Sequence, residues 1–230
     1  CNNFFVSCER LFRPDLEGKP VIVLSNNDGC FISRSAEAKA LGLPMGAPVF
    51  KWKQELRLHD VVLLSANFEL YGDISQRISE VLREVTPLVE VYSIDECFLD
   101  LSQLSIADHA QWAQHLQARV QREVGIPVSI GVAPTKTLAK VATTYAKTHG
   151  GCFAVVDEAA RQAMLRELPI EDIWGLGWRS APRLREQGIS TAEQLLSASD
   201  GWLSGQFNSS GMRMIRELRG EVCLSFGDHH

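Results

Sequence analysis

Residues 89–101 read VEVYSIDECFLDL, and two apolar runs in this segment flank the acidic pair Asp95 and Glu96. Residues 89–94 and 97–101 have the β-branched and aromatic composition of strands, so the sequence predicts two strands around the two carboxylates. Adjacent strand residues point to opposite faces of a sheet. One acid could therefore bind a divalent ion while the other reaches over the sheet edge toward the same ion. An ordinary polar turn is the alternative interpretation of the pair.

The segments on either side of this hairpin alternate between helical and strand patterns. The expected elements are a helix over 67–85, a helix over 106–124, a strand over 127–132, a helix over 135–148 and a strand over 152–156. The order helix, strand, strand, helix, strand is that of a ferredoxin-like (split βαβ) sheet whose first strand would lie at or before Cys1. The sequence therefore predicts an α+β fold.

The two ends of the chain have different patterns. Residues 21–25 and 30–34 flank the turn sequence NNDG and predict a hairpin, which a short helix over 35–41 and a strand over 60–65 follow. After Val156 the strand patterns stop and glycine turns separate short helices, so we place a domain boundary near Asp157. The segment WGLG, residues 174–177, predicts a helix-hairpin-helix whose glycine amides approach a phosphate, with a structural helix corner as the alternative.

Composition excludes several classes of protein. The 230 residues are 45% hydrophobic and 22% charged, which is enough for one large or two small packed domains and excludes a disordered chain. The longest aliphatic runs, 21–24 and 61–64, are far shorter than the roughly 20 residues that cross a bilayer. The 6 cysteines include no C-x-x-C pair, which argues against zinc and favours reduced thiols in a cytoplasmic protein.

Charge is unevenly distributed along the chain. The net charge of −5 alone argues against a nucleic-acid binder. However, residues 134–150 contain three lysines and no acid, and arginines cluster at 179–185 and 213–219. Local basic surfaces on an acidic protein are typical of an enzyme that binds a polyanion at a few defined positions. A solvated helix face would have the same pattern of lysines.

Seven stretches of the sequence, in order along the chain, resemble those of a known protein family. They are NFFVSCE (3–9), FRPDL (12–16), VLSNNDGC (23–30), AEAKALG (36–42), YSIDE (92–96), TKTLAK (135–140) and ELRGE (217–221). With them the chain resembles the Y-family translesion DNA polymerases, in particular the UmuC/MucB/RulB branch, which provides the catalytic subunit of the bacterial SOS mutagenic polymerase. The resemblance implies a ferredoxin-like palm (1–10 and 67–156), small fingers (11–66) and a helical thumb with a helix-hairpin-helix (157–230).

The resemblance also implies a metal site and a sugar filter. In the family three carboxylates and a backbone carbonyl hold two Mg²⁺ ions, and the matching positions here are Asp95, Glu96 and the carbonyl of Cys1. The first of the three acids would stand directly before Cys1, so the chain is expected to be truncated there. Phe5 matches the aromatic steric gate that would collide with a ribose 2′-hydroxyl.

Other matching positions imply contacts with substrates. The expected nucleotide-binding residues are Asn3, Phe4, Phe5, Ser33, Lys39 and Lys147. Many relatives carry a tyrosine where this chain has Ala36, so one phosphate contact is expected to be missing. The expected DNA-binding residues are Gly175, Gly177, Arg179 and Arg183.

The activity implied is error-prone, template-directed synthesis on primer–template DNA with dNTPs, in the SOS response of a bacterial cytoplasm and at the nucleoid when active. The implied partners are a cleaved UmuD-like dimer, RecA and the sliding clamp, with no membrane. A little-finger domain would follow the last residue, so these 230 residues are expected to be weak or inactive alone and to bind DNA weakly. Two alternatives remain: a non-catalytic DNA-binding or regulatory relative, and a palm-type nucleotide cyclase.

Overall fold

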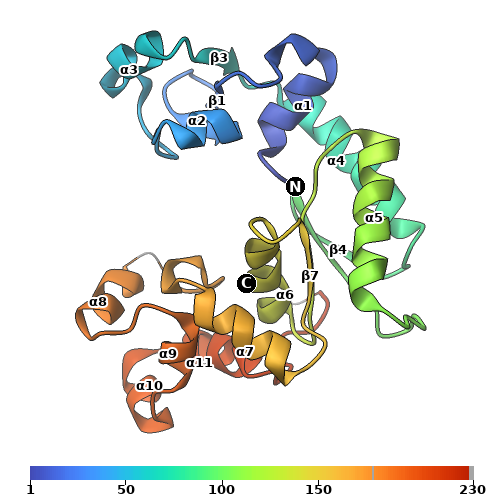
Figure 1. Cartoon of the computed structure of the whole chain (residues 1–230), viewed down its shortest axis with the longest axis vertical. Coiled ribbons are helices and arrows are strands. Elements are labelled where there is room, and N and C mark those ends of the chain that lie inside the picture. The colour runs from blue at the N-terminus through green and yellow to red at the C-terminus, as the bar shows by residue number, and fades with distance from the viewer. Residues whose placement is uncertain (178, 228–230) are drawn as a thin grey trace. The chain divides into compact units, whose positions relative to one another are not determined.

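The computed structural model describes residues 1–177 and 179–227, which form two compact units. The first unit comprises Cys1–Leu101 and Arg119–Val128, and the second comprises Ser102–Ala118 and the described residues from Ser129 onward. Both units contain helices and strands (Figure 1), which confirms the predicted α+β class. None of the helices in the described ranges is long and apolar enough to span a membrane.

A three-stranded sheet with the order β2-β1-β3 lies in the first unit. β1 (Val21–Leu24) pairs antiparallel with β2 (Phe31–Arg34) and parallel with β3 (Val62–Ser65). Asp28, in the loop between β1 and β2, has a φ of 53°, a left-handed conformation that suits the Asn-Asp-Gly turn. The predicted hairpin is therefore confirmed.

Helices surround this sheet and extend the first unit. They are α1 (Phe4–Phe12), α2 (Ala36–Ala40), α3 (Lys53–Leu58) and α4 (Phe68–Arg83), with 3₁₀ turns at Pro14–Leu16 and Val49–Lys51. α1 packs against α4 and against both β1 and β2. The core beneath α2 and α3 consists of buried apolar side chains, among them Ile22, Phe31 and Leu56.

β4 (Val89–Ser93) and β5 (Glu96–Leu99) form the antiparallel hairpin that the sequence predicts. Ser93 pairs with Glu96, so the turn itself contains only Ile94 and Asp95. The prediction that both acids lie between the strands is wrong in this detail, because Glu96 is the first residue of β5. α5 (His109–Val124) follows and begins later than the expected position 106.

In the second unit, α6 (Lys136–Ala146) packs on β6 (Ile130–Val132) and β7 (Cys152–Ala154), which pair in parallel. Gly131 allows this close packing, because a Cβ atom at that position would lie 2.3 Å from the amide nitrogen of Thr143. The order β4, β5, α5, β6, α6, β7 is the one that the sequence predicts.

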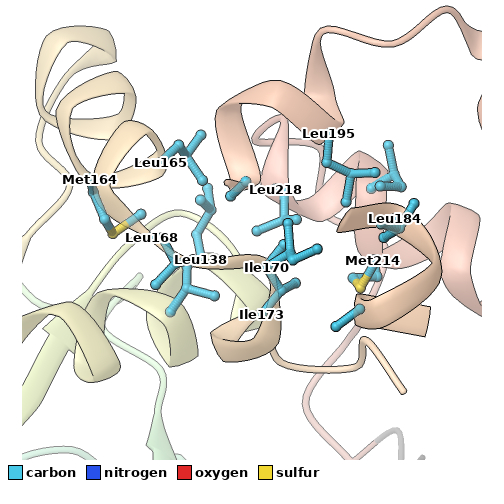
Figure 2. Close-up of a cluster of buried hydrophobic side chains, with 14 of the residues drawn as sticks. Leu138, Met164, Leu165, Leu168, Ile170, Ile173, Leu184, Leu195, Met214 and Leu218 are labelled. Carbon is cyan, nitrogen blue, oxygen red and sulfur yellow. The ribbon is translucent and has the colours of Figure 1, made fainter. Parts of the chain in front are cut away.

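Short helices complete the second unit. They are α7 (Glu158–Glu167), a 3₁₀ turn (Ile170–Asp172), α8 (Ser180–Glu186), α9 (Ala192–Leu196), α10 (Asp200–Gln206) and α11 (Ser209–Leu218). Between 157 and 177 and between 179 and 227 no strand occurs, as expected. Figure 2 shows their common core, in which Leu138 of α6 meets Leu165 of α7, Ile170 and Leu218 of α11.

Candidate metal and nucleotide site

Asp95 lies in the two-residue turn of the β4–β5 hairpin, where Ser93 holds it in place. The Ser93 hydroxyl donates to Asp95 Oδ1 at 2.8 Å and accepts a hydrogen bond from the Asp95 amide at 3.4 Å. Glu96 stands opposite Ser93 at the start of β5, and both acids are half-buried. The turn thus carries two carboxylates, which are hard oxygen ligands of the kind that Mg²⁺ takes.

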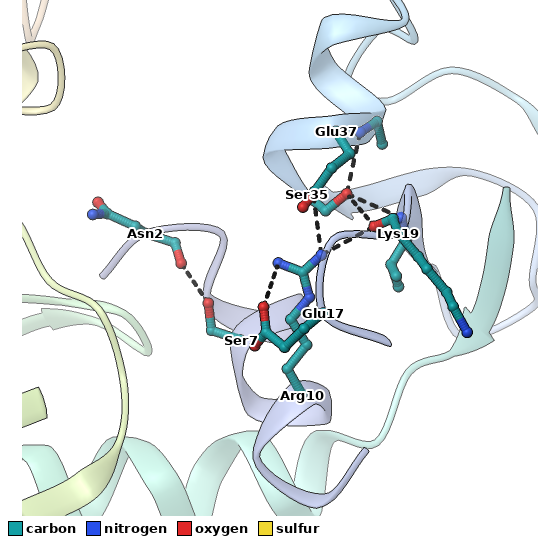
Figure 3. A network of polar contacts seen from close by, with 9 residues as sticks. Asn2, Ser7, Arg10, Glu17, Lys19, Ser35 and Glu37 are labelled. Carbon is teal, nitrogen blue, oxygen red and sulfur yellow. Dashed lines mark hydrogen bonds and ion pairs between the residues drawn. The ribbon is translucent and has the colours of Figure 1, made fainter. Parts of the chain in front are cut away.

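The first residues of the chain lie against this turn. The Cys1 nitrogen donates to the carbonyl oxygen of Asp95 at 2.7 Å, and the Asn2 amide donates to the carbonyl of Pro127 at 2.9 Å. The Ser7 hydroxyl donates to the Asn2 carbonyl at 2.7 Å, which ties this segment to α1 (Figure 3). The structure therefore brings together Cys1 and Asp95, two of the predicted site residues, across 94 positions of sequence.

Asp100 directly follows β5 and lies at the end of the hairpin opposite to the Asp95 turn. Its amide donates to the Leu88 carbonyl at 3.0 Å, and its carbonyl accepts from the Thr86 hydroxyl at 2.9 Å. Within residues 1–177 and 179–227, no cluster of three or more His, Cys, Asp or Glu side chains could hold a metal ion. The carboxylates of Asp95 and Glu96 are oxygen donors, which suit Mg²⁺ better than zinc.

The segment after Cys1 and Asn2 starts a helix. Asn3 has a φ of 48° and directly precedes α1. The first amides of a helix, which here belong to Phe4, Phe5 and Val6, lack partners within the helix and form its positive end. The sequence pattern did not predict α1, so the start of a helix directly after Asn3 is a finding of the structure.

Phe5 lies on the face of α1 that meets α4. Its ring stacks on Tyr71 with a centroid distance of 4.4 Å and an interplanar angle of 14°. Phe4 is buried, whereas Phe5 is only half-buried. A half-buried aromatic ring that is fixed on one face is able to act as a steric barrier on its open side.

Ser33 and Lys39, the predicted nucleotide contacts from the fingers, have different surroundings. Ser33 is buried in β2, and its hydroxyl accepts a hydrogen bond from the Val6 amide at 3.4 Å. Lys39 is exposed on α2. Ser33 therefore joins β2 to the start of α1, and Lys39 is the one of the two that presents its side chain to solvent.

A polar network fixes α2 to α1 (Figure 3). Arg10 donates through Nη2 to the Lys19 carbonyl and to Glu37 Oε2, each at 3.0 Å, and the Ser35 hydroxyl donates to the same carbonyl at 3.3 Å. Burial raises the pKa of Glu37. Hydrogen bonds from its own backbone and from Arg10 lower the pKa by more than burial raises it, so the pKa of Glu37 lies below its ordinary value. Sequence reasoning missed Arg10, because its partners lie 9 and 27 positions away.

The six cysteines are free thiols in the structure. Cys8 is buried in α1, and this burial, with a smaller effect of Glu9, raises the pKa of its thiol to about 12. A thiol that stays protonated in an apolar setting is a packing residue rather than a nucleophile.

The predicted lysine face of α6 is only partly a solvated face. Lys147 caps the end of α6 and is exposed. Lys136 is only 6% exposed, and its Nζ donates to the Ser225 carbonyl at 2.7 Å and lies 5.0 Å from the centroid of the Phe226 ring. Lys136 therefore does not belong to a solvated face of α6, because the segment after α11 covers it.

The predicted DNA-binding segment lies at the start of α8. Gly175 has a φ of 89°, which favours glycine, and the Ser180 amide donates to the Gly177 carbonyl at 2.8 Å. Arg179 precedes α8, Arg183 lies within it, and both are exposed. Trp178, the next residue of the predicted hairpin, lies outside the described residues. The described part of the segment thus contains a glycine turn followed by α8, and its role in DNA binding stays a prediction.

Comparison with known proteins gives consistent matches. The model of the impB/mucB/samB family matches residues 1–144. Protein UmuC of Salmonella typhimurium is 44% identical over 228 residues, which are 97% of this chain and 54% of that protein. Protein MucB of Escherichia coli is 37% identical over 99% of this chain and 55% of its own length. DNA polymerase IV of Brucella melitensis is 36% identical over 96% of this chain and 49% of its own length. The chain therefore spans about half the length of these curated relatives.

Solved structures agree with these sequence matches. DinB from Sulfolobus solfataricus superimposes with a TM-score of 0.80 and 26% identity, over 95% of this chain and 64% of that one. An insertion ternary complex of Dbh DNA polymerase gives a TM-score of 0.79 and 26% identity, over 96% of this chain and 65% of that one. The chain belongs to the impB/mucB/samB family, the UmuC-type branch of the Y-family DNA polymerases.

Proposed function

We propose that this chain acts in template-directed DNA synthesis, as a Y-family polymerase that adds deoxynucleotides to a primer. The observation that carries the proposal is the contact between Cys1 and Asp95. This contact brings the turn that carries Asp95 and Glu96 against Cys1, and the start of α1 with Phe5 follows Cys1 within four residues. Oxygen ligands next to a helix N-terminus suit a nucleoside triphosphate and its metal.

In this proposal Asp95, Glu96 and the Cys1 carbonyl would hold two Mg²⁺ ions. When bound, these ions would supply Lewis-acid stabilisation of the phosphoryl oxygens. The amides of Asn3 and Phe4 would hold triphosphate oxygens, and Phe5 would exclude a ribose 2′-hydroxyl. Ser33, Lys39 and Lys147 complete the proposed nucleotide contacts.

The proposal extends to DNA and to the biological setting. Gly175, Gly177, Arg179 and Arg183 would grip the DNA backbone without reading bases. We assign 1–10 and 67–156 to the palm, 11–66 to the fingers and 157–230 to the thumb. The relatives named UmuC and MucB support a role in error-prone translesion synthesis during the SOS response, in the bacterial cytoplasm. A cleaved UmuD-like dimer, RecA and the sliding clamp are the proposed partners.

Primer extension tests the proposal. The assay uses Mg²⁺ with an undamaged and an abasic template, for the chain as printed and for a variant with an aspartate added before Cys1, the position that the family resemblance gives to a third acid. Asp95→Asn should reduce extension by more than about 100-fold, because even residues that only orient metal ligands affect metal sites by 10–100-fold. Asp100→Asn is the matched control, since Asp100 lies at the far end of the same hairpin, and it should extend primers as the parent does.

The outcomes separate the alternatives. Equal loss in Asp95→Asn and Asp100→Asn would contradict a metal site at the turn. DNA binding without extension in every form, with the proposed partners present, would favour the non-catalytic relative. Formation of cyclic nucleotide from free NTP without a primer would favour the cyclase.

A further inference from the structure

Two rings from α4 surround Phe5, the residue that the proposed function assigns to sugar selection. Tyr71 stacks on the Phe5 ring at 4.4 Å, and Phe68 meets it edge-on at 5.7 Å with an interplanar angle of 86°. Phe68 and Tyr71 are three positions apart, so they lie on neighbouring points of one helix face. They also contact each other edge-on at 5.8 Å. The Phe5 ring thus packs in an aromatic cluster with Phe68 and Tyr71.

Tyr71 is itself held at both ends. It is 0% exposed, and its hydroxyl donates to Glu9 Oε1 at 2.7 Å. Burial, together with Glu9, raises the pKa of Tyr71 well above its ordinary value, so the hydroxyl remains a donor. Glu9 follows Phe5 by four positions on α1, which places both on one face of that helix. Tyr71 therefore spans this face, with its ring under Phe5 and its hydroxyl on Glu9.

We propose that Tyr71 is the positioning residue for Phe5, and that the selectivity of this chain for deoxyribose depends on it. The inference rests on the proposed function, because it assumes that Phe5 faces the sugar of an incoming nucleotide. A barrier against a single hydroxyl group works only if the ring is held within about 0.5 Å and 10–20°. Phe5 is half-buried, so part of its ring is open to solvent, and the stacking contact with Tyr71 restrains the ring on its covered face.

Substitutions at Tyr71 distinguish the positioning of the Phe5 ring from a general loss of stability. The measured quantity is the ratio of kcat/KM for a dNTP to kcat/KM for the matching rNTP, in the form of the chain that extends primers. Tyr71→Ala should lower this ratio by about tenfold or more, the size of effect that one packing contact has on discrimination. Tyr71→Phe keeps the ring and should retain most of the selectivity. Ile78→Ala, a buried change two turns further along α4, is the matched control and should leave the ratio unchanged.

A second measurement does not depend on catalysis. With 4-fluorophenylalanine at position 5, the ¹⁹F resonance of the ring should shift and sharpen in Tyr71→Ala but not in Ile78→Ala. An unchanged resonance in Tyr71→Ala would overturn the inference whether or not the chain is a polymerase. Primer extension with unaltered selectivity in Tyr71→Ala would also overturn it while leaving the proposed function intact. Absence of extension by the parent counts against the proposed function alone, and the ¹⁹F resonance then decides the role of Tyr71.

Discussion

Ser93 decides how the Asp95 carboxylate is presented at the candidate metal site. Its hydroxyl bonds to both the carboxylate and the amide of Asp95, so one side chain fixes the turn and the ligand together. Groups that orient a metal ligand in this way typically change metal affinity by 10–100-fold when they are removed. Ser93 is thus expected to matter for metal binding although it is not itself a proposed ligand.

Ser93→Ala should raise the Mg²⁺ concentration that gives half-maximal primer extension by about tenfold, because the carboxylate loses its only hydroxyl donor described at the turn. A Mg²⁺ titration of extension rates measures this directly. Ser93→Thr keeps the hydroxyl and should restore the parental titration. An unchanged Mg²⁺ requirement in Ser93→Ala would show that the serine only shapes the hairpin.

At the level of single residues, the local sequence pattern predicts some members of the candidate site and misses others. The acids at 95 and 96 stand out because apolar strands flank them, and their placement at a hairpin end follows from that pattern. The pairing of Cys1 with Asp95 depends on a contact across 94 positions, which no local pattern encodes. Tyr71 had a detectable signal, since it continues the buried stripe of Ile74 and Ile78 in α4.

At the scale of elements, Glu217 joins three segments of the second unit. It is 0% exposed in α11, and Oε2 accepts from the Thr137 amide at 2.8 Å. Oε1 accepts from the amides of Cys223 and Leu224, each at 3.0 Å. The Glu217 carboxylate thus accepts a hydrogen bond from the first turn of α6 and also anchors the segment that follows α11. The helix dipole and the backbone donors together compensate the buried charge.

Glu217→Gln should lower the free energy of unfolding by about 3 kcal/mol, the usual range for disrupting a buried charged group and its partners. The amide group of glutamine would place a donor against backbone donors. Urea unfolding measures the change, and faster proteolysis within residues 219–227 would show that the segment is released. Glu221→Gln, an exposed change nearby, is the control. Equal stability of the two variants would contradict the anchoring role.

Elements with a strong local pattern were predictable, and elements shaped by distant partners were not. The β1–β2 hairpin follows from its Asn-Asp-Gly turn, and α4 from its apolar spacing. α1 and α3 were not predicted, because each is short and its apolar residues also fit a buried irregular segment. The burial of Lys136 depends on Ser225, which is 89 positions away.

At the scale of the whole molecule, the net charge is negative although parts of the surface are basic. The net charge is −5, yet Arg179 and Arg183 are exposed beside the glycine turn at 175–177. The neighbouring Arg185 is engaged differently, because its Nη2 donates to Glu171 Oε2 at 2.8 Å. Hydrogen bonding by Arg185 lowers the pKa of Glu171 to about 2, so this carboxylate stays charged even in mildly acidic solution. Of the two arginines within α8, Arg183 is thus the better candidate for a phosphate contact.

This difference predicts how DNA binding responds to salt. The chain should bind primer–template DNA weakly, and the logarithm of its affinity should fall linearly with the logarithm of the salt concentration, because each phosphate contact releases a counterion. Arg183→Ala should reduce the magnitude of that slope by about 1. Arg185→Gln should leave the slope unchanged, because Glu171 already neutralises that guanidinium. Fluorescence anisotropy at several salt concentrations measures both slopes. Affinity that is insensitive to salt would contradict an electrostatic grip, and equal slope changes in the two variants would contradict the assignment of the contact to Arg183.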